Sequence, residues 1–249
     1  MTLMTLERLG VRLGGRPVVE EVDLRVGPGE LVGLIGPNGA GKTSLMRAAL
    51  GLLPFNGSSD LAALSPADRA RRVAWMPQSR EIAWPVSVET LVSFGRLPHG
   101  PAGLPADRMA VEAALERMEL GPLRHRPATD ISGGERACAL FARALAQDTP
   151  LLLADEPAAG LDPAHQVGLM RLLSELTGEG RGILVSMHDL GLALRHCTRL
   201  VLLDHGRKAA DGVPRDVLTA ELLSRVFGVR AHLSETEDGP IFQVLDTLR

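Results

Sequence analysis

Residues 36–43 read GPNGAGKT and fit the pattern G-x-x-x-x-G-K-[ST] at every position. The stretch follows a short apolar run, ELVGLIG, and precedes a helical pattern, KTSLMRAALGLL, so it joins a strand to a helix. In such a loop the backbone N–H groups surround a phosphate, and the N-terminus of the helix adds positive potential. The stretch therefore predicts an α/β core that binds a polyphosphate. The alternative is a glycine-rich turn that matches the pattern by chance.

The loop is expected to supply most of the nucleotide contacts. Lys42 offers a point charge to the β- and γ-phosphates, and the Thr43 hydroxyl offers a ligand to Mg²⁺. The predicted cofactor-binding residues of this loop are Gly36, Pro37, Asn38, Gly39, Ala40, Gly41, Lys42, Thr43 and Ser44.

A second motif, LLLADEP at 151–157, places two acids at the end of an apolar strand. A carboxylate in that position is costly unless something cationic satisfies it. We expect Asp155 to hold Mg²⁺ through water and Glu156 to orient and polarise the nucleophilic water. The alternative is an ordinary acidic pair that caps a turn.

A third motif, ISGGE at 131–135, opens an amphipathic helix. Two glycines in a first helical turn cost stability, and they let the backbone approach a ligand closely. Ser132, Gly133 and Gly134 therefore predict a second anion-binding helix N-terminus. The alternative is that Ser132 is only an N-cap and that Glu135 completes a capping box; the two interpretations are compatible.

The remaining pattern alternates strands and helices. Runs before residue 30 favour β-hairpin strands, the helix after the phosphate loop is expected to run to Pro54, and the pattern turns helical from about Ser87 until LLLAD. We therefore predict an α/β fold with a nucleotide-binding core over residues 1–78 and 150–249. An N-terminal antiparallel β-subdomain belongs to this core, and an inserted α-helical subdomain over 79–149 carries ISGGE.

Composition narrows the classes of partner. The formal net charge of -3 gives no basic surface, so nucleic acid is not a predicted partner. Cys138 and Cys197 lack metal-site spacing and are expected to pack on helix faces in a reducing compartment. The first ten residues lack the apolar core of a signal peptide, and no apolar run approaches the roughly 18 residues of a membrane span. We expect a soluble, cytoplasmic chain that is able to dock on a membrane protein.

Six motifs follow one order: GPNGAGKT at 36–43, MPQ at 76–78, ISGGE at 131–135, LLLADEP at 151–157, AAGLD at 158–162 and SMHD at 186–189. In order and rough spacing the chain resembles the ATP-binding cassette (ABC) ATPases over nearly its whole length. The resemblance implies a P-loop NTPase core, ATP and Mg²⁺ as cofactors, and two subunits paired head to tail. Ser132 and Gly134 would then contact the γ-phosphate held by a second copy of the chain.

The resemblance also implies chemical roles for single residues. Gln78 would reach the metal and the water, His188 would contact the γ-phosphate, and Asp162 would lie in a loop that crosses the dimer interface. The predicted catalytic residues are Glu156, His188, Gln78 and Lys42, and the predicted metal ligands are Thr43, Gln78 and Asp155.

Each of these residues has a structural alternative. Gln78 is otherwise a solvated loop residue, and His188 caps the next helix or sits satisfied in the core. Asp162 precedes Pro163 and fits an N-cap with proline at the first helical position, a role that is compatible with a place at the dimer interface.

At Leu13, where many relatives carry an aromatic that stacks on adenine, we expect weaker adenine selectivity.

The resemblance implies membrane partners. The helical insertion would grip a short helix of an integral membrane permease, which would hold the chain on the inner face of the cell membrane. The run WPVSVETLVSFGRLPHG at 84–100 is similar to importers of iron-chelates, haem and cobalamin, which receive their substrate from a substrate-binding protein. The alternatives are an exporter or other-substrate ATPase, a non-transport ATPase acting on nucleic acid, and, for Trp84 and Phe94, simple packing inside the insertion.

Overall fold

A six-stranded sheet forms the centre of the computed structural model, which describes residues 2–100 and 104–248. Five strands run parallel and the last pairs antiparallel with its neighbour. In spatial order they are β5 (Val73–Met76), β6 (Leu151–Asp155), β7 (Gly182–Ser186), β3 (Leu31–Ile35), β8 (Arg199–Asp204) and β9 (Arg207–Gly212). This sheet confirms the predicted α/β core.

Strand β3 lies inside this sheet, and both of its faces are buried. Leu31 and Ile35 pack in a hydrophobic core with the helices α5 (Gly133–Ala146), α6 (Pro163–Gly178) and α7 (Leu190–His196). Val32 and Leu34 point the other way, into a second core that includes α1 (Lys42–Ala49). Successive strand residues face opposite sides, so a strand covered on both faces is apolar throughout. The phosphate loop therefore begins at the end of a firmly packed strand.

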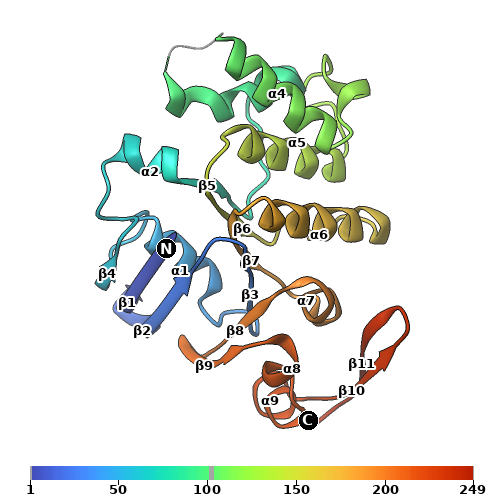
Figure 1. Cartoon of the computed structure of the whole chain (residues 1–249). Coiled ribbons are helices and arrows are strands. Elements are labelled where there is room, and N and C mark those ends of the chain that lie inside the picture. Colours follow the sequence, from blue (N-terminus) through green and yellow to red (C-terminus); the bar gives the residue numbers. More distant parts are fainter. Residues whose placement is uncertain (1, 101–103, 249) are drawn as a thin grey trace.

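The N-terminal residues form an antiparallel sheet beside α1, as predicted. Its strands are β2 (Arg16–Val26), β1 (Met4–Leu13) and β4 (Asn56–Ser59), in that spatial order. The alternation of buried and exposed residues along β1 and β2 seals one face of this sheet against the second core. Figure 1 shows the sheet and α1 together at the left of the view.

A group of helices lies between β5 and β6 in sequence and at the top of Figure 1. It contains α3 (Val88–Ser93), the 3-10 turn η1 (Phe94–His99), α4 (Pro105–Arg117), the short turn η2 (Gly121–Leu123) and α5. A buried ion pair joins two of them: Arg96 Nε lies 3.0 Å from Asp107 Oδ1, and Arg96 Nη1 donates to Ala146 O at 2.8 Å. The insertion is thus helical as predicted, and its boundaries at 79 and 149 stay a prediction.

Helix α1 is shorter than the sequence pattern suggested. It ends at Ala49 because Gly51 adopts a left-handed conformation, with φ of 67°. The amides of Gly51 and Leu52 then donate to Ala48 O and Arg47 O, each at 2.8 Å, which is the hydrogen-bond pattern of a Schellman stop. The prediction that this helix runs to Pro54 is therefore wrong.

Several short elements complete the chain. Helix α2 (Pro66–Arg72), which the sequence pattern did not indicate, precedes β5. After β9 come α8 (Pro214–Val217), α9 (Ala220–Leu222) and the turn η3 (Leu223–Phe227). The chain closes in a hairpin of β10 (Val229–Thr236) and β11 (Gly239–Thr247) at the lower right of Figure 1. No helix within the described ranges combines the length and apolarity that a membrane crossing needs.

Candidate functional site

The phosphate loop joins β3 to α1, and its glycines permit a close-packed turn. Gly36, Gly39 and Gly41 all have positive φ, at 147°, 80° and 100°. A Cβ at Gly36 would lie 2.2 Å from Leu203 O, and one at Gly41 would lie 2.6 Å from Val18 O. No other residue fits these two positions without moving backbone, so the sequence pattern follows directly from the packing of the loop.

Lys42 lies buried inside this loop and folds back onto it. Its Nζ donates to Gly36 O at 2.7 Å and to Pro37 O at 3.1 Å. Burial lowers the pKa of Lys42, while the nearby carboxylates of Glu156 and Asp155 raise it. Asn38 and Gly39 are exposed at the loop tip, and Ala40 is buried under it. Thr43 and Ser44 follow in the half-buried first turn of α1.

Asp155 ends β6 and is 1% exposed. Its Oδ1 accepts a hydrogen bond from Ser186 Oγ at 2.5 Å, whereas its Oδ2 is buried and has no hydrogen-bond partner within the described residues. An unsatisfied buried carboxylate oxygen is strongly unfavourable. The site therefore fits a cation: a hard ion such as Mg²⁺ prefers oxygen ligands of this kind.

Glu156 follows Asp155 and is the meeting point of three strand ends. Its Oε2 accepts from Gln78 Nε2 at 3.0 Å, and its Oε1 lies 2.5 Å from His188 Nε2. Gln78 follows β5, Glu156 follows β6 and His188 follows β7. Because these parallel strands are neighbours, their carboxyl ends bring the three predicted side chains together.

Two residues of this cluster were not assigned a role from sequence. Ser186 Oγ donates to Asp155 and accepts from the Glu156 amide at 2.8 Å, so one buried hydroxyl orients both acids. Arg80 Nη2 lies 3.2 Å from Glu156 O. A serine at the end of the strand that precedes His188 was the available signal for Ser186. Nothing in the pattern around Arg80 pointed to its contact.

The ISGGE segment lies elsewhere on the surface. Ser132 caps α5: its Oγ accepts from the Glu135 amide at 3.2 Å, and Glu135 Oε2 accepts from the Ser132 amide at 2.7 Å. The latter bond lowers the pKa of Glu135. Ser132 and Gly134 line a small hollow of about 280 Å³ with Gly160 and Asp162 of the same chain. No hydrogen bond or ion pair among the described residues joins this segment to the phosphate loop, so the structure shows no bond between the two predicted phosphate sites of one chain.

Ser132 and Asp162 both cap helices, whereas His188 and Gln78 contact Glu156. The capping box at Ser132 is confirmed, and Asp162 is indeed an N-cap, accepting from the His165 amide at 3.0 Å. His188 neither caps α7, a role that Asp189 fills, nor sits in the core. Gln78 is exposed but not merely solvated, since it contacts Glu156.

The packing alternative for the aromatics of the insertion is wrong, because Trp84 is 74% and Phe94 42% exposed. Of the cysteines, Cys197 is buried and Cys138 half-buried, in keeping with packing.

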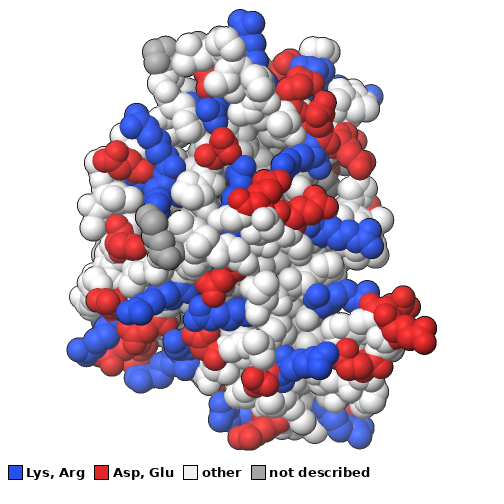
Figure 2. Space-filling view, viewed as in Figure 1, with Lys and Arg blue, Asp and Glu red and all other residues white. Residues whose placement is uncertain are grey.

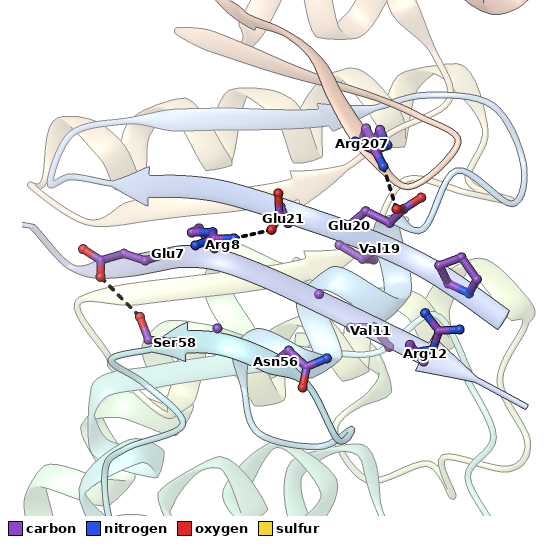
Figure 3. Close-up of a pocket in the computed structure, with 13 residues that line it drawn as sticks. Glu7, Arg8, Val11, Arg12, Val19, Glu20, Glu21, Asn56, Ser58 and Arg207 are labelled. Carbon is purple, nitrogen blue, oxygen red and sulfur yellow. Dashed lines mark hydrogen bonds and ion pairs between the residues drawn. The ribbon is translucent and has the colours of Figure 1, made fainter. Parts of the chain in front are cut away.

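Another hollow is separate from this cluster. It measures about 620 Å³ and lies over β1, β2 and β4 (Figure 3). Its charged side chains already have partners: Arg8 with Glu21, and Arg207 with Glu20 at 2.7 Å. On the face shown in Figure 2, positive and negative side chains are interspersed over all parts of the molecule. The hollow has no buried lysine of the kind found at Lys42 among its lining residues.

A glycine loop around a buried lysine, with an unsatisfied aspartate and a half-buried glutamate at the end of a nearby strand, defines a P-loop nucleoside triphosphatase. The family model described as ABC transporter matches residues 19–159, and the chain belongs to this family. It is an ATP-binding, ATP-hydrolysing cassette with a mixed α/β fold.

Relatives and solved structures agree with this assignment. The hemin import ATP-binding protein HmuV of Pseudomonas entomophila is 41% identical over 91% of this chain and 93% of its own length. The cobalamin import ATP-binding protein BtuD of Halobacterium salinarum is 40% identical over 91% of this chain and 60% of its own length. A metal-chelate type ABC transporter in an inward-facing conformation has the same fold, with a TM-score of 0.85 at 24% identity, covering 98% of this chain and 97% of that one.

Proposed function

We propose that this chain powers a membrane importer for a haem- or cobalamin-like substrate or another iron-chelate, by hydrolysing ATP at the cluster around Glu156. The observation that carries the proposal is the meeting of Gln78, Glu156 and His188 beside the unsatisfied Oδ2 of Asp155. The importer part rests on similarity to relatives named for hemin and cobalamin import.

Different residues would bind the phosphates and the metal ion. Lys42 and the backbone amides of Asn38 to Lys42 would bind the β- and γ-phosphates, for which Lys42 must give up its bonds to Gly36 O and Pro37 O. Thr43, Gln78 and Asp155 would hold Mg²⁺, and the free Oδ2 of Asp155 supports this choice. When bound, Mg²⁺ supplies positive charge that offsets the charge of the triphosphate.

Glu156 would accept a hydrogen bond from the attacking water and take its proton at the carboxylate. In the structure, the two carboxylate oxygens of Glu156 contact Gln78 and His188. The water must therefore take the place of one of these contacts. His188 is then free to turn its ring N–H toward the γ-phosphate, which holds the geometry of attack.

The second half of the nucleotide site would come from another copy of the chain. Ser132, Gly133 and Gly134 open a helix of 14 residues, and the first two residues are exposed. A helix N-terminus of this kind attracts anions. Head-to-tail pairing would place it against the γ-phosphate bound by the partner, with Asp162 in the loop that crosses the interface.

The helical insertion would carry the membrane contact. Trp84, Phe94 and Leu97 are 74%, 42% and 66% exposed, which is unusual for large apolar side chains close together in sequence. They suit a short apolar helix of a permease. The chain would then work peripherally at the inner face of the membrane, and a substrate-binding protein would meet the same permease from the other side.

The catalytic proposal is tested with Glu156→Gln. We expect ATP to bind with unchanged affinity and turnover to fall by about 10²–10⁴-fold, since the base is lost. The matched control is Glu179→Gln, which alters an exposed carboxylate in the same way. Full turnover of Glu156→Gln would remove this residue from its role.

The transport proposal is tested by co-purifying the chain with its permease and reconstituting both in vesicles. Uptake of hemin or cobalamin should require ATP on the side that carries this chain. ATP-driven extrusion, or a complex that forms with nucleic acid and with no permease, would contradict an importer.

A further inference from the structure

Arg80 contacts main-chain carbonyls at the catalytic cluster instead of a carboxylate. Its Nη2 lies 3.2 Å from Glu156 O and 3.2 Å from Pro157 O. A Cβ built on Gly160 would lie 3.7 Å from Arg80 Nη1, so the guanidinium also borders the loop that leads to Asp162. One half-buried side chain therefore spans residues 156–160.

The backbone of Glu156 requires such support. Its φ is 50°, in the left-handed region that a residue with a side chain rarely adopts. Strained backbone of this kind persists only where neighbouring groups hold it. The Glu156 amide donates to Ser186 Oγ at 2.8 Å, and the Glu156 carbonyl accepts from Arg80. The two sides of the residue are thus fixed by two different parts of the chain.

The chemistry of arginine suits this place. Two adjacent carbonyls in a half-buried position both need a donor, and a guanidinium presents several N–H groups in a fixed plane. Lysine would offer a single centre on a flexible stem. Burial lowers the pKa of Arg80, but a guanidinium remains charged.

Arg80 and Gln78 hold Glu156 from one segment. Gln78 Nε2 donates to the carboxylate at 3.0 Å, and Arg80 donates to the main chain of the same residue. The segment continues to the exposed Trp84. A displacement of this segment would disturb the side chain and the backbone of Glu156 together.

We propose that Arg80 is a positioning residue for ATP hydrolysis, which holds the left-handed backbone of Glu156 so that its carboxylate meets the attacking water. The inference rests on the proposed role of Glu156. The inference adds Arg80 to the site. Through this side chain, the segment after Gln78 contacts the loop before Asp162.

The test compares Arg80→Ala, Arg80→Gln and Arg80→Lys in the purified full-length chain. Misplacement of a reacting group by about 1 Å costs up to roughly 10²-fold in rate. We expect kcat of Arg80→Ala to fall by about 10- to 100-fold, with the KM for ATP and the affinity for ATP within about twofold of wild type. Arg80→Lys keeps one donor and should recover part of kcat. Arg108→Ala, which removes an exposed arginine from α4, is the matched control and should be silent.

A double-mutant cycle separates positioning from a general structural role. If Arg80 acts through Glu156, Arg80→Ala should cost little further single-turnover rate in the Glu156→Gln background. Undiminished kcat in all three variants, a loss confined to ATP affinity, or the full loss repeated in that background would overturn the inference. Full turnover of Glu156→Gln alone is a different result: it overturns the proposed catalytic role of Glu156, whereas the Arg80 variants report on the positioning.

Discussion

Leu13 ends β1 and is 43% exposed. The resemblance to ABC ATPases implies that adenine lies against this place, and a leucine has no ring to stack on it. Base–aromatic stacking contributes about 1–3 kcal/mol. We expect Leu13→Tyr to bind ATP at least about fivefold more tightly than wild type, by calorimetry.

The binding of inorganic tripolyphosphate is the control for this substitution, since it has phosphates and no base. It should be unchanged in Leu13→Tyr. Equal ATP affinity of the two proteins would mean that adenine does not lie against this residue.

Because Cys197 is buried, we expect the free energy of unfolding to fall at alkaline pH. Burial raises its pKa from 9.0 to about 12. Above the ordinary pKa of a thiol, Cys197 loses its proton in the unfolded chain but keeps it in the folded chain. The free energy of unfolding therefore falls with each further rise in pH. The stabilising effect of the neutral thiol is complete below pH 9.0 and is lost as the pH rises toward about 12.

Urea unfolding at pH 8 and pH 10 measures this effect. The free energy of unfolding should fall more steeply for wild type than for Cys197→Ala. The chain has no tyrosine, and its lysines are Lys42 and Lys208, so few other groups titrate in this range. Equal pH dependence in both proteins would contradict the burial of this thiol.

Single residues were predictable where a motif dictates a backbone. The glycines at 36 and 41 leave no room for a side chain, and that constraint is written in the sequence. The contacts of Ser186 and Arg80 were not predictable, because they join residues 31 and 76 positions apart. No local pattern reports such a pairing.

At the scale of elements, the buried pair between Arg96 and Asp107 fixes η1 against α4. Their side chains are 9% and 10% exposed. Removal of one partner of a buried pair typically costs about 3–5 kcal/mol, since the other charge stays buried. We expect Asp107→Ala to lower the free energy of unfolding by this amount in denaturant titrations.

The exposed pair between Arg215 and Glu235 serves as the control. Its side chains are 68% and 53% exposed, so Arg215→Ala should cost less than about 1 kcal/mol. Similar losses in the two variants would show that the pair on the insertion is not shielded from water.

The sequence indicated elements with a strong period and missed the weak ones. The strands β3, β6 and β7 are each five residues long and buried throughout, and each is built around a run of apolar residues, which identified them. Helix α2 was missed because its sequence, PADRARR, has no apolar face, and none of its residues is buried. The expected length of α1 was wrong because the left-handed Gly51 ends the helix inside an apolar stretch.

At the scale of the whole molecule, we expect ATP to join two chains through the ISGGE segment. In the Glu156→Gln background, ATP should produce a dimer in sedimentation experiments. Gly134→Ala should abolish it, because a methyl group would keep the backbone from the partner's phosphate. A Cβ at Gly134 meets only Leu161 Cδ2, at 3.7 Å, so the fold of the single chain has room for the change.

Gly168→Ala is the matched control, since a Cβ there meets nothing within 4 Å on the exposed side of α6. It should dimerise as the parent does. A dimer that survives Gly134→Ala unchanged would place the interface elsewhere.

The first hydrophobic core crosses the boundary between the helical insertion and the ATPase sheet. Val92 and Leu115 of the insertion belong to the same cluster as Leu152 of β6 and Ile183 of β7. Insertion and sheet should therefore melt together in one cooperative transition. A nucleotide bound at the phosphate loop stabilises the folded chain by mass action, and it should therefore protect the insertion from proteolysis as well as the sheet.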